Sequence, residues 1–348
     1  MYHYERVVTP ATGLRLHLNE NTAGCSPAVH AALQGMNRHD VAFYPDYDAA
    51  IEASAVRLGV PPAHVLLTNG LDEGILALTV SALRGTTAAE PFEVVVVVPA
   101  FDMYAACADA IGGRVIEVPL GSDFAFPLEQ VLARIGPRTR LVWLTNPNNP
   151  TGQSIAREAI LRVASAASQA LVVVDEAYAD FSGETLLEGE ALDSFANLVV
   201  GRTFAKAYGL AGLRAGVLVA QPGTLAPLRR IVPPYSINAC AAAALPAALS
   251  DGGYHAWYLS QVSESKRLLY AAFERLGVTF WRSEANFVLA RPSGNCAALV
   301  RALRERGIYV RDKSRDPGCT NCIRVTAGVA DDTRTFIAAL EEVLCGAA

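Results

Sequence analysis

The sequence has no long run of positive charge. Its 29 lysines and arginines are outnumbered by 34 aspartates and glutamates, which gives a formal net charge of −5 at pH 7. Proteins that bind nucleic acid or an anionic membrane surface usually carry a basic cluster, so neither partner is expected. A small anionic substrate remains compatible with this composition, because a few local arginines suffice to bind one.

Neither a secretory signal nor a membrane-spanning run is evident in the sequence, and neither is expected. The first residues, Met1 to Arg6, are polar and charged where a secretory signal would be apolar. The longest stretch without charge, residues 231–250, contains three prolines and is rich in alanine. This composition predicts a loop followed by a tightly packed helix, and no membrane span.

The cysteines form neither a disulfide framework nor a metal site. Seven are scattered along 348 residues, and in a chain of this size without a leader they favour reduced thiols in the cytoplasm. Cys319 and Cys322 have C-x-x-C spacing, but no second pair or histidine cluster completes a metal set. We therefore expect a cytoplasmic protein without a bound metal.

Apolar residues, by contrast, make up 52% of the chain. Short β-branched runs alternate with longer helix-like segments, which predicts an α/β fold around a mostly parallel sheet. Several runs are apolar throughout, as strands covered on both faces require. The predicted strands are 65–68, 93–98, 115–118, 141–145, 171–174, 198–200 and 217–220, and helices between them include 72–83, 103–111, 128–135 and 157–168.

The pattern changes near residue 254, where a long helix (254–276) is predicted. Extended segments at 285–290, 307–311 and 323–326 and helices at 296–306 and from 332 onward follow it. We expect a large domain of residues 38–250 and a small α+β domain of residues 1–37 and 251–348. The N-terminal segment is expected to pack on the small domain.

A lysine and an arginine follow the predicted strand 198–200 in a glycine-rich segment. Lys206 lies among small and apolar residues, and desolvation lowers a lysine pKa so that the neutral amine can attack an aldehyde. Arg214, eight residues later, is suited to hold a phosphate. The pair suggests an anchor for pyridoxal phosphate, although two surface charges would give the same pattern.

Other predicted strands also end in polar or glycine-rich segments, and ligands of α/β folds bind at such strand ends. Asp175 ends a buried strand, where a carboxylate needs a partner such as a pyridinium N–H or a helix cap. Asn149 lies in a turn with two Asn–Pro steps. Residues 69–74 form a glycine turn that opens a helix, a typical anion site. Phe101 follows strand 93–98 and suits either a cofactor ring or the core.

These motifs, in this order, resemble those of the pyridoxal-phosphate-dependent aminotransferases of fold type I. The chain is most similar to the histidinol-phosphate aminotransferase family, over nearly its whole length. The resemblance implies a large domain with a mostly parallel seven-stranded sheet. The motifs are residues 18–21, 44–45, 69–73, 146–152, 175–178, 202–214, 234–238, 285–287, 311 and 323–326.

The resemblance implies a role for each motif residue around the cofactor. Lys206 forms the Schiff base and moves the proton, and Asp175 pairs with the ring nitrogen. Asn149 and Tyr178 bind the phenolate oxygen. The remaining contacts implied are stacking by Phe101, phosphate binding by Gly70, Leu71, Asp72, Thr203 and Arg214, and a phosphate contact by Tyr44 from the other subunit of a homodimer.

On the substrate side, the resemblance implies that Arg324 clamps a carboxylate, that Arg311 faces a substrate phosphate and that Asn19 lies in the site. Arg311 also fits a surface charge within a basic stretch. Three departures from the family pattern bear on this chemistry: Ala205 and Leu71 where serine is common, and Ala23 where a substrate-facing tyrosine is common.

The reaction implied is histidinol phosphate plus 2-oxoglutarate to imidazole acetol phosphate plus glutamate. Within the same cofactor class, an aromatic or other amino-acid aminotransferase and a phosphothreonine decarboxylase-like enzyme are the alternatives. A nucleotide-binding oxidoreductase is the alternative from another class. It is disfavoured, because no G-x-G-x-x-G turn opens the first strand–helix unit.

Overall fold

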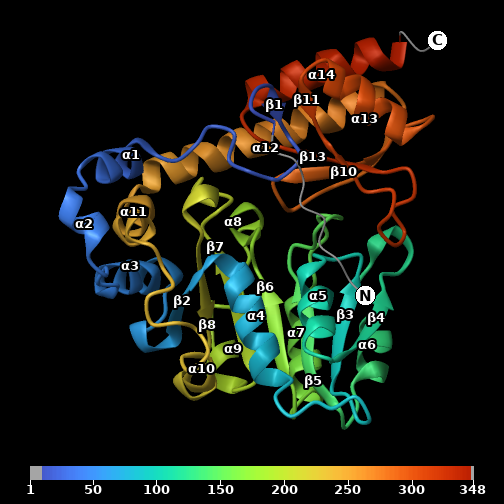
Figure 1. Cartoon of the computed structure of the whole chain (residues 1–348). Helices are drawn as coiled ribbons and strands as arrows, with labels where there is room; N and C mark the ends of the chain where they lie inside the picture. The colour runs from blue at the N-terminus through green and yellow to red at the C-terminus, as the bar shows by residue number, and fades with distance from the viewer. Residues whose placement is uncertain (1–9, 346–348) are drawn as a thin grey trace.

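A computed structural model describes residues 10–345 (Figure 1). Met1 to Arg6, for which the sequence analysis expects no secretory signal, lie outside the described residues. Within residues 10–345, every helix is too short or too polar to cross a bilayer. The uncharged stretch 231–250 contains a loop and then helix α11 (Ala239–Ser250), as predicted.

A seven-stranded sheet forms the centre of the larger part of the molecule. Its strand order is β2-β8-β7-β6-β5-β3-β4. The strands β3 to β7 run parallel, and only β8 is antiparallel to its neighbours β2 and β7. The predicted α/β fold class is therefore confirmed. The strands are β2 (Val65–Asn69), β3 (Glu93–Val98), β4 (Arg114–Pro119), β5 (Thr139–Thr145), β6 (Leu171–Asp175), β7 (Leu198–Thr203) and β8 (Ala215–Val219).

Both faces of this sheet are buried, which explains the uninterrupted apolar runs. In β3, Val94 and Val96 pack into one hydrophobic cluster, whereas Val95 and Val97 pack into another on the opposite face. Successive side chains of a strand point to opposite faces, so a strand covered on both sides must be apolar throughout.

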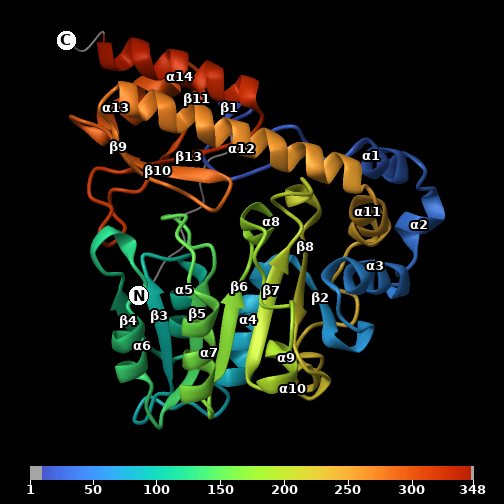
Figure 2. The same ribbon diagram turned by 180° about the vertical axis from the view of Figure 1, so that it is seen from behind.

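Helices cover the two faces in separate layers. In Figure 1, α4 and α5 lie in front of the sheet, and Figure 2 shows α6 and α7 over the opposite face. The helices of this part are α1 (Pro27–Gln34), α2 (Arg38–Ala42), α3 (Asp48–Leu58), α4 (Gly70–Ala82), α5 (Met103–Ala110), α6 (Leu128–Arg134), α7 (Arg157–Ala166), α8 (Ala179–Ser182), α9 (Ala191–Ser194), α10 (Pro222–Leu228) and α11. Single 3₁₀ turns span Pro62–His64, Ser122–Phe124 and Ala211–Leu213.

A second, smaller group of elements lies over the carboxyl ends of the parallel strands (Figures 1 and 2). It has a four-stranded antiparallel sheet in the order β12-β13-β10-β9 and a two-stranded parallel sheet of β1 and β11. Its elements are β1 (Leu14–Arg15), α12 (Gly252–Arg275), β9 (Thr279–Trp281), β10 (Phe287–Arg291), α13 (Cys296–Glu305), β11 (Ile308–Tyr309), β12 (Arg311–Asp312), β13 (Ile323–Thr326) and α14 (Ala330–Cys345).

Three details differ from the sequence-based expectations. The segment 307–311 forms parts of two strands, because β11 pairs with β1 and β12 pairs with β13 in different sheets. Strand β9, only three residues long, was not predicted. The N-terminal segment is shared between the two groups: β1 joins the small one, whereas Val29 of α1 packs into the core of the large one.

Candidate active site

A cavity of about 350 Å³ lies where the carboxyl ends of the parallel strands meet the smaller group of elements. Strand-end residues line one side, and the segment after β1 together with β12 and β13 lines the other. Of the fourteen residues predicted for the site, twelve line this cavity, namely Asn19, Leu71, Asp72, Phe101, Asn149, Asp175, Tyr178, Thr203, Lys206, Arg214, Arg311 and Arg324. Gly70 immediately precedes the lining residue Leu71 but does not itself line the cavity, and Tyr44 lies outside the cavity.

Lys206 follows β7 and turns its amine toward the N-terminal segment. Its Nζ donates a hydrogen bond to the carbonyl oxygen of Leu18 at 3.0 Å. Burial lowers the pKa of this amine to about 8, and the positive charge of Arg324 adds to the effect. A substantial fraction of the amine is therefore neutral near pH 8, which is the state in which it acts as a nucleophile or base.

Asp175 ends β6 and is 5% exposed. One carboxylate oxygen accepts from the backbone N–H of Ala177 at 2.9 Å, and the other accepts from the hydroxyl of Tyr104. Burial raises the pKa of this carboxyl to about 6, and the two hydrogen bonds act in the opposite direction. A cationic N–H in the cavity would relieve this cost of burial.

Two side-chain amides connect the smaller group of elements to the strand ends of the large sheet. The amide of Asn19, a residue 1% exposed, donates to the Tyr178 hydroxyl at 3.0 Å. The amide oxygen of Asn149 accepts from Nη1 of Arg324. Both amides thus fix the orientation of groups that point into the cavity from opposite sides.

The N-terminus of α4 faces the cavity beside Arg214. Gly70 has φ +69, and a Cβ atom there would lie 2.5 Å from Nη2 of Arg214, so glycine suits this position. Arg214 donates to Asp72 at 2.7 Å. Thr203 is the last residue of β7, the strand that pairs with β8. Free N–H groups of a first helical turn beside an arginine form a site for a phosphate.

Two arginines lie side by side on neighbouring strands. Arg311 of β12 and Arg324 of β13 are directly opposite in the antiparallel register. Arg324 is 7% exposed and donates from Nη2 to the carbonyl oxygen of His17 at 2.8 Å. Within residues 10–345, Arg311 has no carboxylate within 4.0 Å. Two guanidinium groups therefore line the cavity, and such groups suit anionic substrates.

Tyr44 lies outside the cavity of its own chain. It is 77% exposed in the segment between α2 and α3 and stacks on Tyr235, with 4.1 Å between ring centroids. Phe101, in contrast, lines the cavity and meets Tyr104 edge to face at 5.8 Å. A contact from Tyr44 to a cavity would have to be made in a second copy of the chain.

Sequence reasoning missed Tyr104 and Lys313. Tyr104 is fully buried, stacks on Trp143 at 4.4 Å and hydrogen-bonds Asp175, so its pKa is raised well above the ordinary value, mainly by burial. Its only sequence signal is its place one helical turn after Phe101. Lys313 also lines the cavity, although the basic stretch around it resembles a solvated surface.

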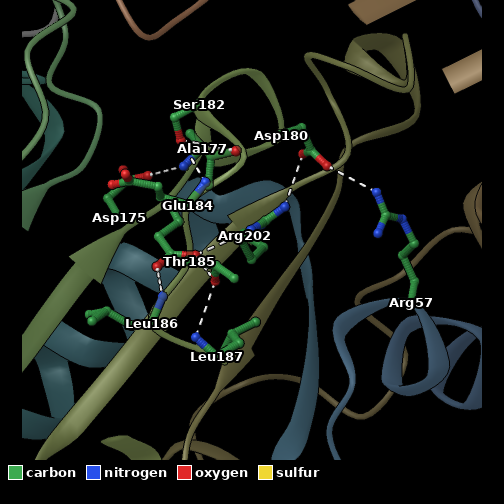
Figure 3. Close-up of polar contacts among 12 residues, drawn as sticks. Arg57, Asp175, Ala177, Asp180, Ser182, Glu184, Thr185, Leu186, Leu187 and Arg202 are labelled. Atoms are coloured by element: carbon green, nitrogen blue, oxygen red, sulfur yellow. Dashed lines mark hydrogen bonds and ion pairs between the residues drawn. The ribbon is translucent and has the colours of Figure 1, made fainter. Parts of the chain in front are cut away.

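A buried ion network lies beneath the site (Figure 3). Arg202 is 8% exposed and bridges Glu176 at 3.2 Å and Asp180 at 3.0 Å. Asp180 is also approached by Arg57 at 3.6 Å and by His255 at 3.2 Å. Burial opposes ionisation of Asp180, but Arg202 and its other partners prevail and lower its pKa to about 2. The network ties α3 and α12 to the turn that carries Asp175 and Tyr178.

The C-x-x-C pair lies away from the cavity. Cys319 and Cys322 are free, fully buried and packed with Phe124 and Leu289. Burial raises the pKa of both thiols, that of Cys319 to about 12. These thiols are core residues and weak nucleophiles.

The residues around the cavity fit pyridoxal phosphate. A buried carboxylate at one end matches a protonated ring nitrogen, and a helix N-terminus with Arg214 matches a phosphate. Because Gly70 has no Cβ, the guanidinium of Arg214 can lie against this turn. Lys206 provides the amine that an aldehyde requires. The strand order and the place of the cavity define the fold type I of pyridoxal-phosphate-dependent transferases.

Comparison with known proteins identifies the family. Residues 11–340 match the family described as aminotransferase class I and II, and the chain belongs to this pyridoxal-phosphate-dependent family. It is 36% identical to the histidinol-phosphate aminotransferase of Moorella thermoacetica over 95% of this chain and 85% of that protein. The corresponding values for histidinol-phosphate aminotransferase 2 of Ralstonia nicotianae are 37%, 96% and 89%.

A solved structure agrees with this assignment. The histidinol-phosphate aminotransferase of Sinorhizobium meliloti, in complex with pyridoxal 5′-phosphate, superimposes with a TM-score of 0.86 at 29% identity. The match covers 96% of this chain and 91% of that one. The chain is thus a pyridoxal-phosphate-dependent aminotransferase, an enzyme that acts on small-molecule amino donors and acceptors.

Proposed function

We propose that this aminotransferase moves the amino group of histidinol phosphate to 2-oxoglutarate, giving imidazole acetol phosphate and glutamate in histidine biosynthesis. The observation that carries the proposal is the pairing of Arg311 and Arg324 on adjacent strands, both facing the cavity. An amino donor with a phosphate and an acceptor with two carboxylates both need cationic partners at this place. The relatives named above carry the same activity in their names.

Lys206 is proposed as the residue that holds the cofactor and transfers the proton. When bound, pyridoxal phosphate supplies an aldehyde carbon that accepts the amino group and a ring that spreads negative charge. The amine of Lys206 has a pKa near 8, so it can both take and return a proton near neutral pH. Its hydrogen bond to the carbonyl oxygen of Leu18, which also lines the cavity, holds Nζ in place.

The other predicted residues are proposed to orient the cofactor. Asp175 would hold the ring nitrogen in its protonated form, and Tyr178 and Asn149 would donate to the ring oxygen. Phe101 would cover one face of the ring. The phosphate would be held by Gly70, Leu71, Asp72, Thr203 and Arg214, with Arg214 giving up its present partner Asp72.

Substrate binding is proposed to use both sheets. Arg324 would bind the carboxylate of the 2-oxo acid with its planar fork, and its bonds to Asn149 and His17 hold that fork in place. Arg311 would meet the phosphate of the amino donor. Asn19 would contact the substrate beside Tyr178.

A homodimer is proposed as the active unit, with Tyr44 reaching the cofactor phosphate of the partner. Large apolar side chains gather on the exposed surface around it: Val41, Phe43 and Tyr44 are each at least 68% exposed, and Tyr235 is 55% exposed. A patch of this kind is typical of an interface. We also place the enzyme in the cytoplasm, where its free, buried thiols such as Cys107 stay reduced.

Amino-transfer assays with the purified holoenzyme test the substrate. Single-turnover and steady-state kcat/KM values are measured for histidinol phosphate, phenylalanine and phosphothreonine, with 2-oxoglutarate as acceptor. The proposal predicts the highest value for histidinol phosphate. Good transfer from phenylalanine without transfer from histidinol phosphate would assign an aromatic aminotransferase, and release of CO₂ from phosphothreonine would assign a decarboxylase.

A further inference from the structure

Lysine is rare in this chain, and one of the few lysines is buried in the cavity wall. The sequence has three lysines, Lys206, Lys266 and Lys313, against twenty-six arginines. Lys313 is 9% exposed and lines the cavity together with Lys206. A buried ammonium loses hydration, and burial together with the charge of Arg324 lowers the pKa of Lys313. A buried cation of this kind needs an interaction that offsets the cost of its desolvation.

Lys313 and Arg311 point to the same side of their strand. The backbone N–H of Lys313 donates to the carbonyl oxygen of Cys322 at 2.9 Å, so the pairing of β12 with β13 continues through this residue. Residues two apart on an extended strand share a face. The two cations consequently stand next to each other at the cavity, and Asp312 between them is exposed.

The protein supplies a counterion for one of the two cations. Nζ of Lys313 lies 2.5 Å from a carboxylate oxygen of Asp316, and both side chains are mostly buried. Asp102, at the start of α5, also faces this group: burial raises its pKa, whereas Lys313 and Arg311 lower it. Arg311 has no carboxylate partner within 4.0 Å in the described part of the chain.

Asp102, Arg311 and Lys313 lie between the active-site cavity and a second cavity, because they line both. This outer cavity, of about 910 Å³, shares His17, Phe101, Asp102, Arg311 and Lys313 with the inner one. The imidazole of His17 is 3% exposed, and neither ring nitrogen has a hydrogen-bond partner among the described residues. Among residues 10–345, Arg311 therefore has no carboxylate within 4.0 Å, and neither ring nitrogen of His17 has a hydrogen-bond partner.

We propose that Lys313 is a specificity-determining residue, which with Arg311 forms a two-cation receptor for a dianionic group at the far end of the amino donor. Asp316 is the internal counterion that holds the ammonium while this group is absent. This inference rests on the proposed function, because it assigns the residues that recognise the substrate phosphate.

The charges explain why a dianion is the fitting ligand. A phosphate monoester carries between one and two negative charges at neutral pH and has three acceptor oxygens. Two adjacent cations match it, whereas a single carboxylate is matched by one arginine. An ammonium has three donors, so Lys313 can turn from Asp316 to an entering phosphate without moving the backbone.

The first experiment compares two donors that differ only in the phosphate. Values of kcat/KM are measured for histidinol phosphate and for histidinol with the holoenzyme of the parent and of Lys313→Met. Loss of one charge-assisted contact predicts that the ratio of the two values falls about 10- to 100-fold. An equal loss for both donors would show a structural role only and would overturn the inference.

Arg315→Met is the matched control. Arg315 is an exposed cation two residues further along, and it lines the outer cavity but not the inner one. Its removal changes the overall charge as Lys313→Met does, and the donor ratio should stay within about 3-fold. A similar fall in both variants would mean a general electrostatic effect and would contradict the receptor.

Inorganic phosphate provides a test that does not depend on histidinol phosphate as substrate. It should inhibit transfer from any donor that the holoenzyme uses, with a Ki about 10-fold higher in Lys313→Met. In Asp316→Asn, which frees the ammonium, the Ki should fall about 3- to 10-fold, and this variant also covers the case in which Lys313→Met does not fold.

The outcomes separate the two claims. If the parent does not use histidinol phosphate but the phosphate Ki depends on Lys313 and Asp316, the proposed function fails and the receptor stands. If histidinol phosphate is used but neither the donor ratio nor the Ki responds, the receptor fails and the function stands. If histidinol phosphate is not used and the Ki is unchanged, both fail.

Discussion

At the scale of single residues, the fold buries the carboxyl of Asp175 at a place where a cationic partner would stabilise its ionised form. Its carboxyl lies at a strand end, 5% exposed, with hydrogen bonds from Tyr104 and from the backbone of Ala177. These bonds offset only part of the desolvation, and the pKa stays raised at about 6. Compared with water, the protein alone thus shifts this carboxyl toward its neutral form, and a cationic partner would shift it back toward the carboxylate.

The sign of the resulting pH dependence can be tested on cofactor-free protein. The folded carboxyl keeps its proton up to about pH 6, whereas the unfolded one loses it near pH 3.9. This contribution to stability is present below about pH 4 and is lost as the pH rises through 6. Relative to Asp175→Asn, the parent should lose about 3 kcal/mol over this interval in urea unfolding. A difference that does not change with pH would contradict the assignment.

The sequence analysis selected residues at the end of a predicted strand or a few positions after it. Asp175, Asn149 and Lys206 are predicted in this way, and the structure places all three in the lining of the cavity. The sequence does not predict Lys313 as a site residue, because Arg311, Lys313 and Arg315 together have the pattern of a basic stretch exposed to solvent. Only the pairing of β12 with β13 shows that alternate residues of this stretch face inward.

At the scale of elements, the start of α4 depends on Gly70. This residue has φ +69 and lies against Arg214, so a side chain would both strain the backbone and displace the guanidinium. Gly70→Ala should cost about 1 kcal/mol in stability and weaken pyridoxal phosphate binding about 10-fold or more. Both are measurable by thermal unfolding and by cofactor titration.

Gly59→Ala is the control for this prediction. Gly59 ends α3 with φ +68, and nothing lies within 4 Å of where its Cβ would be. The variant should suffer a similar loss of stability but keep the cofactor affinity of the parent. Equal effects of the two variants on cofactor binding would show that Arg214 is not held by this turn.

The network around Arg202 connects several elements through buried charge. Arg202→Met leaves Glu176 and Asp180 without their main cation and should reduce the free energy of unfolding by about 3–5 kcal/mol. Arg275→Met removes a cation from an exposed pair with Glu341 and should cost at most about 1 kcal/mol. Similar losses in both variants, measured by denaturant unfolding, would contradict the structural importance of the buried network.

The elements themselves were largely predictable, for a physical reason. Strands buried on both faces must be apolar throughout, and β3 was predicted with its observed bounds. Short strands at the edge of the small group were not, because three residues such as those of β9 carry too little periodicity to be recognised. The two halves of 307–311 join different sheets, a long-range choice that local sequence does not determine.

At the scale of the whole molecule, we propose the division into residues 38–250 and residues 1–37 with 251–348. Separate hydrophobic clusters support it: two lie on the two faces of the seven-stranded sheet, and another lies beneath α12 and α14. Helix α1 packs against α11 of the large part, so the N-terminal segment crosses between the two. The cavity lies at this boundary, because residues of both parts line it.

The proposed dimer predicts a concentration-dependent mass. Sedimentation should give about twice the chain mass of 36.9 kDa, and Phe43→Asp, which places a charge in the exposed apolar patch, should yield monomers with weakened cofactor binding. His30→Asp adds a charge on exposed surface of α1 and should remain dimeric. A parent protein that is monomeric and fully active would refute a shared active site.

Attachment of the cofactor to Lys206 underlies the whole proposed chemistry, and the scarcity of lysine makes this attachment directly measurable. The holoenzyme is reduced with borohydride, digested and mapped by mass spectrometry, with Lys266 and Lys313 as the only other lysines. We expect the reduced pyridoxal phosphate adduct on Lys206 alone, and we expect the adduct and the visible absorbance to be lost in Lys206→Ala. An adduct on Lys313, which lines the same cavity, or an undiminished adduct in Lys206→Ala would contradict it.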